Sequence, residues 1–144
     1  MDALEVLKQD HQKVKGLFQE MRKATDQSGR TELFDKIGTD LEIHAHIEET
    51  IFYPAVERHE ELKDMVAEAL EEHQEAKDLL DELEQLGSES PDFGSKMQEL
   101  MEAVEHHVEE EEGELFPKIR EVFPEDELER LGQELESTKG TRHL

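Results

Sequence analysis

Histidine and glutamate recur in this chain in two sets that have the same order and closely similar spacing. Each half has a lone histidine and, more than thirty residues later, a histidine with glutamate four positions after it: His11, His44 and Glu48 in the first half, and His73, His107 and Glu111 in the second. Pro54 and Pro117 each stand ten positions after the second histidine of their set. Imidazole and carboxylate are common ligands of first-row transition metals, so two matched sets indicate metal chemistry.

All six side chains fall on the apolar faces of expected helices. Apolar residues recur at steps of three and four, the period of one helix face. The four faces include Leu4, Leu7, His11, Val14 and Phe18; Phe34, Ile37, Leu41, His44, Glu48 and Ile51; Val66, Ala69, His73, Ala76 and Leu80; and Met97, Leu100, Val104, His107, Glu111 and Leu115. The pattern therefore predicts polar side chains inside a helical core.

A polar group in a core needs a partner. An unpaired buried carboxylate costs several kcal/mol or more, and two of them in one small core repel each other. A pair of divalent metal ions removes both costs, because it supplies positive charge to Glu48 and Glu111. Histidine at position i and glutamate at i+4 lie one turn apart on the same helix face, so both can reach a common centre.

Other interpretations exist for the single residues. One core histidine is commonly a hydrogen-bonded structural residue, and one glutamate can pair with Lys or Arg. The occurrence of four histidines and two glutamates in matching halves favours a shared metal centre instead. His106 also has a glutamate four positions later, but the apolar period and the repeat select His107. Glu49 and Glu112 are candidates for the surface, which we favour, or for contacts that support the metal ligands. Tyr53 is expected to pack beside the bend at Pro54 rather than to serve in redox chemistry.

The expected fold is all-α: an up-down-up-down four-helix bundle with an internal two-fold repeat over residues 1–122. Turn-like residues 26–30 are expected to separate the first two helices, residues 59–61 the second and third, and Gly87 to end the third. Ser90 with Pro91 is expected to start the fourth. Pro54 and Pro117 should bend or end their helices. Residues 123–144 are predicted to form a short helix to about residue 137 and a loose tail.

Composition limits the possible functions. The chain has 144 residues, enough for one domain, and 39% of them are charged, with a formal net charge of −24. This acidity argues against binding to nucleic acid or an anionic membrane. With no cysteine, disulfides, zinc–thiolate sites and iron–sulfur clusters are excluded. The absence of a signal-like start and of an 18-residue apolar run leads us to expect a soluble, cytoplasmic protein. Both a monomer and a dimer are compatible with the sequence.

Taken together, these motifs resemble the hemerythrin-like, or HHE cation-binding, domain. The resemblance covers roughly residues 1–122. It depends on four motifs: Asp10-His11, His44-x-x-x-Glu48-Glu49-x-x-Phe52-Tyr53-Pro54, Glu72-His73, and His107-x-x-x-Glu111-Glu112-x-x-Leu115-Phe116-Pro117.

The resemblance implies a non-haem di-iron centre with an oxo or hydroxo bridge. By this analogy, His11 and His44 bind one iron, His73 and His107 bind the other, and two glutamates bridge them. Manganese or zinc could occupy the same ligands.

The chain departs from the oxygen-carrying hemerythrins in one respect. Those carriers have a further histidine one turn after the third-helix histidine, where this chain has Lys77. They also place an Asp five residues after the fourth-helix histidine, where this chain offers Glu111 at plus four and Glu112 at plus five. With two histidines and shared carboxylates, each iron would keep an open or water-filled position. We expect the side chain of Lys77 to extend to solvent.

Three functions follow from the resemblance. In the first, the reduced centre binds or senses O2 or another small diatomic such as nitric oxide, or responds to redox or iron state. In the second, the open positions serve an enzyme acting on peroxide or O2, such as an oxidase, peroxidase or catalase-like protein. In the third, the acidic chain stores iron or repairs iron sites.

Overall fold

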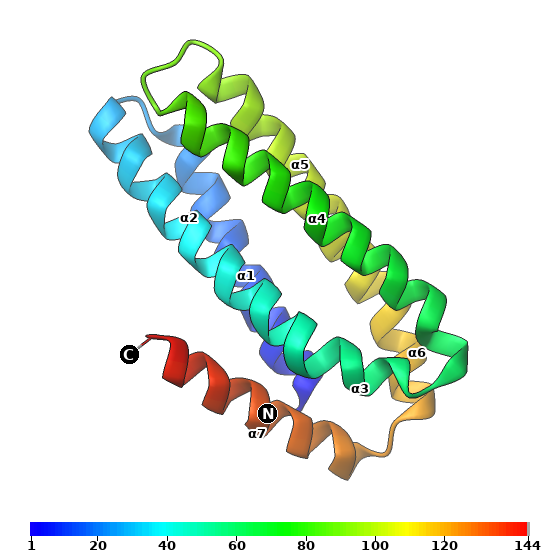
Figure 1. The fold of residues 1–144 in the computed structure, drawn as a ribbon. Helices are drawn as coiled ribbons and strands as arrows, with labels where there is room; N and C mark the ends of the chain where they lie inside the picture. Colours follow the sequence, from blue (N-terminus) through cyan, green and yellow to red (C-terminus); the bar gives the residue numbers. More distant parts are fainter. Residues whose placement is uncertain (144) are drawn as a thin grey trace.

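The structure is a computed structural model that describes the backbone of residues 1–143 and the side chains of residues 1–140. Its framework is four long helices, α1 (Ala3–Lys23), α2 (Gln27–Ile47), α4 (Lys63–Leu86) and α5 (Phe93–Glu110), and the described residues form no strand. Successive helices run in opposite directions, with α1 packed mainly against α2 and α4 against α5 (Figure 1). The predicted up-down-up-down bundle is confirmed.

Pro54 and Pro117 each follow a π-helical segment at the end of a long helix. The segment η1 (Glu48–Phe52) joins α2 to the short α3 (Tyr53–Glu57), and η3 (Glu111–Leu115) joins α5 to α6 (Phe116–Val122). The Tyr53 N–H donates to the Glu48 carbonyl, five residues back, and Phe116 repeats this bond to Glu111. Because proline has no N–H to continue the α-helical ladder, the chain widens into a π turn, which starts at the predicted site glutamate in both halves.

The connections between helices are short. The first is only residues 24–26, since α2 already begins at Gln27, within the turn predicted for residues 26–30. The second bends at residues 58–59 and continues as η2 (Glu60–Leu62), close to the predicted break. Gly87 ends α4 with a φ of 78°, a conformation that favours glycine. α5 begins at Phe93, two residues later than predicted, because residues 90–92 form a turn in which the Asp92 N–H donates to the Ser90 hydroxyl.

The C-terminal helix is longer than the sequence indicated. α7 runs through Glu125–His143, so the tail predicted to be loose from residue 138 continues the helix, and Leu144 lies outside the described residues. α7 packs along α1 (Figure 1) and buries Leu128 and Leu135. The approach is so close that a Cβ at Gly132 would collide with the backbone of residues 1–3. The boundary at residue 122 stays a prediction.

Two apolar clusters divide the bundle core along its length. One includes Leu7, Ile47, Val66 and Leu115, and the other includes Val14, Ile37, Leu80 and Val104. Along α1, α2, α4 and the continuous run of α5 and η3, the predicted site histidine lies between a residue of the first cluster and a residue of the second. The polar side chains therefore form one layer between two apolar layers. No helix within the described residues is both long and apolar enough to cross a membrane.

Candidate metal centre

The structure brings all six sequence-predicted site residues together in the buried layer. Glu48 and Glu111 are 0% and 2% exposed, and the four histidines are at most 9% exposed. His106, which the apolar period and the repeat had ruled out in favour of His107, points outward with 63% of its side chain exposed. The repeat and the apolar period thus identified the histidine of this pair that faces the core.

Each glutamate lies between histidines from the two halves of the chain. Glu48 Oε1 is 3.1 Å from His44 Nε2 and 2.9 Å from His73 Nε2. In the second half, Glu111 Oε1 is 3.2 Å from His11 Nε2, and its Oε2 is 3.3 Å from His107 Nε2. Both carboxylates therefore connect the two halves, as bridging groups of a two-metal site would.

Two groups of donor atoms in this layer are compact enough to hold a metal ion. The atoms of each group lie within 4.8 Å of one another, and the groups are His11, His44, Glu48 and Glu111, and Glu48, His73 and His107. Glu48 belongs to both. This division matches the assignment of His11 and His44 to one metal and of His73 and His107 to the other.

The outer nitrogen of every site histidine is held by a carboxylate. The Nδ1 contacts are His44 with Asp10 at 3.0 Å, His107 with Glu72 at 2.7 Å, His73 with Glu49 at 2.8 Å and His11 with Glu112 at 2.6 Å. A carboxylate at Nδ1 favours the tautomer with its proton there, which leaves the inner Nε2 lone pair free for a metal.

Of the two placements considered for Glu49 and Glu112, the favoured one on the surface was wrong, and the other, against the candidate ligands, is the one found. Their side chains are 26% and 29% exposed, and each accepts a hydrogen bond from a histidine of the other half. The signal was present in the repeat, because both directly follow a site glutamate. Asp10 and Glu72, which each precede a site histidine, hold the remaining two imidazoles.

Two lysines break the symmetry of this outer layer. Lys77 lies one turn after His73, and its Nζ is 2.9 Å from Glu49 Oε1, although 46% of its side chain stays exposed. Lys139 of α7 pairs with Asp10. The Lys77 side chain is exposed, as expected, and its ammonium group also secures the carboxylate that orients His73. Lys139 does the same for His44 through Asp10.

Tyr53 belongs to the site, although the sequence analysis placed it only at the helix bend. Its buried hydroxyl donates to Glu111 Oε2 at 2.5 Å and lies 3.3 Å from His73 Nε2. Burial, followed by the charges of Glu48 and Glu111, raises the Tyr53 pKa, so the phenol keeps its proton in the metal-free chain. The repeat could not reveal it, because its counterpart is Phe116, whose ring lies parallel to that of His11.

The charges within the layer compensate one another in the metal-free chain. Burial alone would lower the pKa of His107, but the adjacent carboxylate of Glu111, followed by that of Glu48, raises it to about 9. The pKa of His44 is likewise well above its ordinary value despite burial, mainly because of Glu48. Burial would raise the pKa of Glu48, but His44 and His73 hold it well below the usual range. Protons on the histidines thus offset the buried carboxylates.

A cation fits the space between these groups. Five buried side-chain atoms have no hydrogen-bond partner within the described residues: His11 Nε2, His44 Nε2, His107 Nε2, Glu48 Oε2 and Glu111 Oε1. Three of these nitrogens approach carboxylate oxygens at 3.1–3.3 Å, but without the alignment of a hydrogen bond. Unpaired donor atoms of metal-binding types that converge on one buried layer are what a metal centre needs.

Comparison with known proteins gives the family. The model of the hemerythrin HHE cation binding domain matches residues 2–119. The chain belongs to this family. The resemblance inferred from the histidine and glutamate motifs is therefore confirmed, and cation binding is the property that the family's description states.

The structure is also similar to a solved family member. A hemerythrin HHE cation binding domain-containing protein from Mycobacterium kansasii superposes with a TM-score of 0.89 at 30% sequence identity, covering 99% of this chain and 87% of that one. Because α7 lies beyond the matched residues 2–119, the coverage of 99% indicates that the solved protein also has chain corresponding to much of α7.

Two curated relatives are longer proteins. A DNA nickase from Nostoc sp. is 32% identical over 145 residues, and an uncharacterised hemerythrin-like protein from Schizosaccharomyces pombe is 28% identical over 132 residues. These alignments include 96% and 90% of this chain but only 39% and 65% of the relatives. The chain therefore corresponds to one part of each relative.

Proposed function

We propose that the chain is a di-iron protein whose reduced centre binds O2 or another small diatomic such as nitric oxide, or responds to redox or iron state. The observation that supports this most is the convergence of four imidazole Nε2 atoms and two buried carboxylates in one layer. The donor set suits iron, and manganese and zinc have overlapping preferences. Both metal positions have few protein ligands, so each leaves room for an exogenous one.

The proposed ligands divide into two sets with shared carboxylates. His11 and His44 would hold one ion, His73 and His107 the other, and Glu48 and Glu111 would bridge them. A bound pair of irons would supply reversible electron transfer and coordination positions for a small ligand. The chain's own groups orient the imidazoles through four outer carboxylates, and an apolar layer lies on each side of the centre.

Tyr53 has a separate role in this proposal. Its hydroxyl holds a proton between Glu111 and His73, inside the layer that would contain the metals. The same oxygen lies beside Glu111 Oε2 and His73 Nε2. With a metal pair bound, Tyr53 would therefore supply a hydroxyl next to one half of the centre, where Phe116 offers none in the other half.

An enzyme acting on peroxide or O2 is the second candidate. The observation that favours it is a cavity of about 460 Å³ that reaches all four site histidines, because a catalyst needs space for a substrate beside its metal. We do not extend DNA nicking from the Nostoc relative to this chain, because a net charge of −24 repels the phosphates of DNA.

The proposal is tested with iron-loaded, anaerobically reduced protein mixed with O2, nitric oxide or hydrogen peroxide in a stopped-flow spectrometer. We expect a new absorption band with O2 or nitric oxide and its loss in His107→Ala. Catalytic decay of peroxide that depends on His107 would favour the enzyme. Uptake of many irons per chain would favour storage. A reduced, iron-loaded protein that gives no spectral change with any of the three would contradict the proposal.

A further inference from the structure

A cavity in the bundle reaches the four site histidines. It has a volume of about 460 Å³ and is lined by side chains from α1, α2, α4 and α5. All four site histidines line it, whereas Glu48, Glu111 and Tyr53 are not among the described residues that do. A molecule in the cavity would therefore meet the imidazole side of the centre, opposite the bridging carboxylates.

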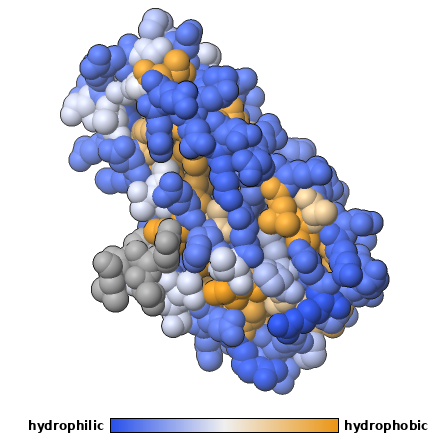
Figure 2. Space-filling model, in the orientation of Figure 1, coloured by the Kyte–Doolittle hydropathy of each residue, from blue (hydrophilic) through white to orange (hydrophobic). Residues whose placement is uncertain are grey.

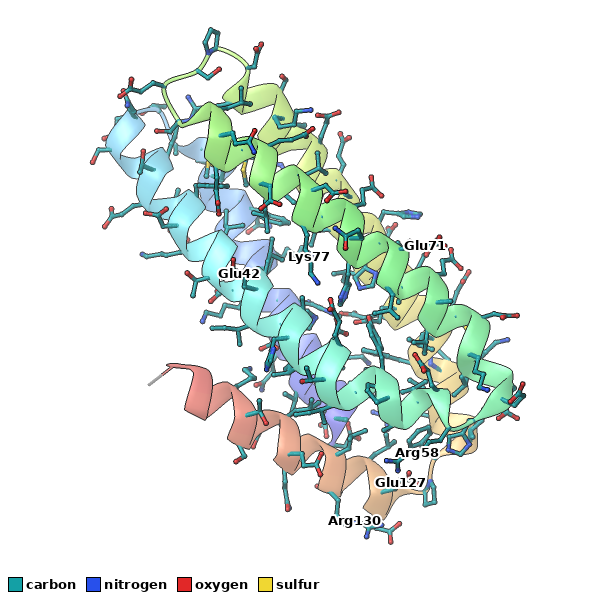
Figure 3. The ribbon with its side chains drawn as sticks, in the orientation of Figure 1. Glu42, Arg58, Glu71, Lys77, Glu127 and Arg130 are labelled. Carbon is teal, nitrogen blue, oxygen red and sulfur yellow. The ribbon has the colours of Figure 1, made fainter. Side chains whose placement is uncertain are left out.

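The cavity has an apolar wall and a charged rim. Its wall is formed by Val14, Leu41, Ala76, Leu80, Val104 and Val108. The exposed lining residues are Glu42 on α2 and Gln74, Lys77 and Asp81 on α4, so the cavity opens between these two helices. Lys77 and Glu42 lie on the facing sides of that opening (Figure 3). Apolar surface is visible between charged side chains in the same region (Figure 2).

The cavity is too large for a diatomic ligand alone. Two cations with a few coordinated oxygens take up about as much space as five water molecules, roughly 150 Å³ at about 30 Å³ each. More than half of the cavity would then remain. An engineered cavity of about 150 Å³ already holds benzene, and pockets of about 300–1,000 Å³ typically bind organic ligands. The remaining space suits an organic molecule.

Charge at the rim favours a neutral ligand. Lys77, the one lysine among the described lining residues, already contacts Glu49 at 2.9 Å. The other rim charges, Glu42 and Asp81, are negative, as is the chain as a whole at −24. An anionic head group would be repelled at the opening. An apolar chain lying against the aliphatic wall would remove apolar surface from water, which is favourable.

We propose that this cavity binds a neutral, largely apolar organic molecule with one oxygen-bearing end, such as a medium-chain alcohol or alkyl hydroperoxide, whose polar end faces the imidazoles. The apolar part lies against the wall from Leu41 to Val108. The assignment of the polar end to the metal side rests on the proposed di-iron function, but binding of the apolar part does not.

Binding is tested with 1-octanol as the probe, measured by calorimetry and by displacement of the neutral dye N-phenyl-1-naphthylamine. Both the iron-loaded and the metal-free protein are used. We expect saturable binding, with affinity rising about fourfold per methylene from 1-hexanol to 1-octanol, the factor for burying one methylene group. Octanoate, which has the same chain length and a negative charge, is expected to bind about tenfold more weakly.

Two variants fill the cavity and one serves as a control. Ala76→Phe on α4 and Ala103→Phe on α5 place a ring in the lining and should weaken octanol binding about tenfold or more by direct clash. Two positions on different helices guard against a local failure to fold. Ala67→Phe adds the same ring at an exposed site on α4 and should leave the affinity unchanged. Circular dichroism checks that each variant is helical.

The outcomes separate this inference from the proposed function. If octanol binds but iron does not, the cavity assignment stands and the di-iron function fails. If iron binds and no octanol is bound in either form, the inference alone is wrong. Octanoate binding more tightly than octanol would contradict a neutral ligand and indicate an anion site. Equal affinity for octanol in all three phenylalanine variants would show that octanol binds elsewhere.

Discussion

Removal of the metal ions should destabilise the fold by several kcal/mol. A ligand that binds only the native state stabilises it by about 2.7 kcal/mol when its free concentration is 100 times its dissociation constant. Two such sites give about 5 kcal/mol. The structure offers a source for this energy, since five buried polar atoms have no hydrogen-bond partner within the described residues and each such atom costs about 1–3 kcal/mol.

This energy converts into a large shift of the melting temperature. A chain of this length shifts by roughly 3–4 °C per kcal/mol, so the loaded protein should melt about 15–20 °C above the chelated protein. Thermal melts followed by circular dichroism at pH 7, with and without chelator, measure the shift directly.

Glu48→Gln with Glu111→Gln is the matched variant for this experiment. It keeps the shape of both side chains but removes the two buried charges that would bridge the metals. We expect the double variant to lose most of the metal-dependent shift. If chelated and loaded wild-type protein melted within 2 °C of each other, in melts with a precision well below ~1 °C, the predicted stabilisation by metal would be wrong. The buried layer would then be stable without a cation.

Three further predictions follow from single residues. The His107 pKa of about 9 lies above the ordinary 6.5, so in the metal-free chain this histidine adds about 3 kcal/mol of stability below pH 6.5, which is lost as the pH rises to 9. Metal binding should therefore release protons at pH 7. Identical binding heats in buffers of different ionisation enthalpy would contradict this. Tyr53→Phe removes a buried hydrogen bond to a carboxylate and should lower the free energy of unfolding of the metal-free chain in urea by about 1.5–3 kcal/mol. It should also change the optical spectrum of the iron form, a change that Phe52→Leu would not reproduce. Lys139→Met should lower the free energy of unfolding by about 1 kcal/mol and, in a stepwise titration, weaken the binding of one metal ion more than that of the other. Lys139→Arg should restore both the stability and the binding. Equal weakening of the binding of both metal ions would argue against the role of Lys139 at His44.

The six candidate ligands could be predicted because two independent patterns coincide on them. Helical periodicity shows which side chains face the core, and the repeat shows that His44 with Glu48 corresponds to His107 with Glu111. Burial of a charged group without a metal is costly, so the pattern also suggested its chemistry. The bundle follows from the same periodicity, because four apolar faces of similar length can be covered only by packing together.

The remaining features depend on tertiary contacts that a single helix does not reveal. Glu49 and Glu112 bind imidazoles of the other half, so their role appears only when the helices are packed. Tyr53 has no counterpart of the same type in the repeat. Nor does periodicity reveal the π segments that begin at Glu48 and Glu111, because a π turn inserts one residue into the helical ladder. The extension of α7 depends on packing against α1 and on the pairing of Lys139 with Asp10.

The di-iron centre is tested most directly by the iron content of the purified chain after anaerobic loading with ferrous iron, oxidation and desalting, read together with its near-ultraviolet spectrum. We expect two irons per chain with an oxo-bridge band, and fewer than one iron in Glu48→Gln with Glu111→Gln. Wild-type protein that retains no iron, or a double variant that retains as much iron as the wild type, would contradict it.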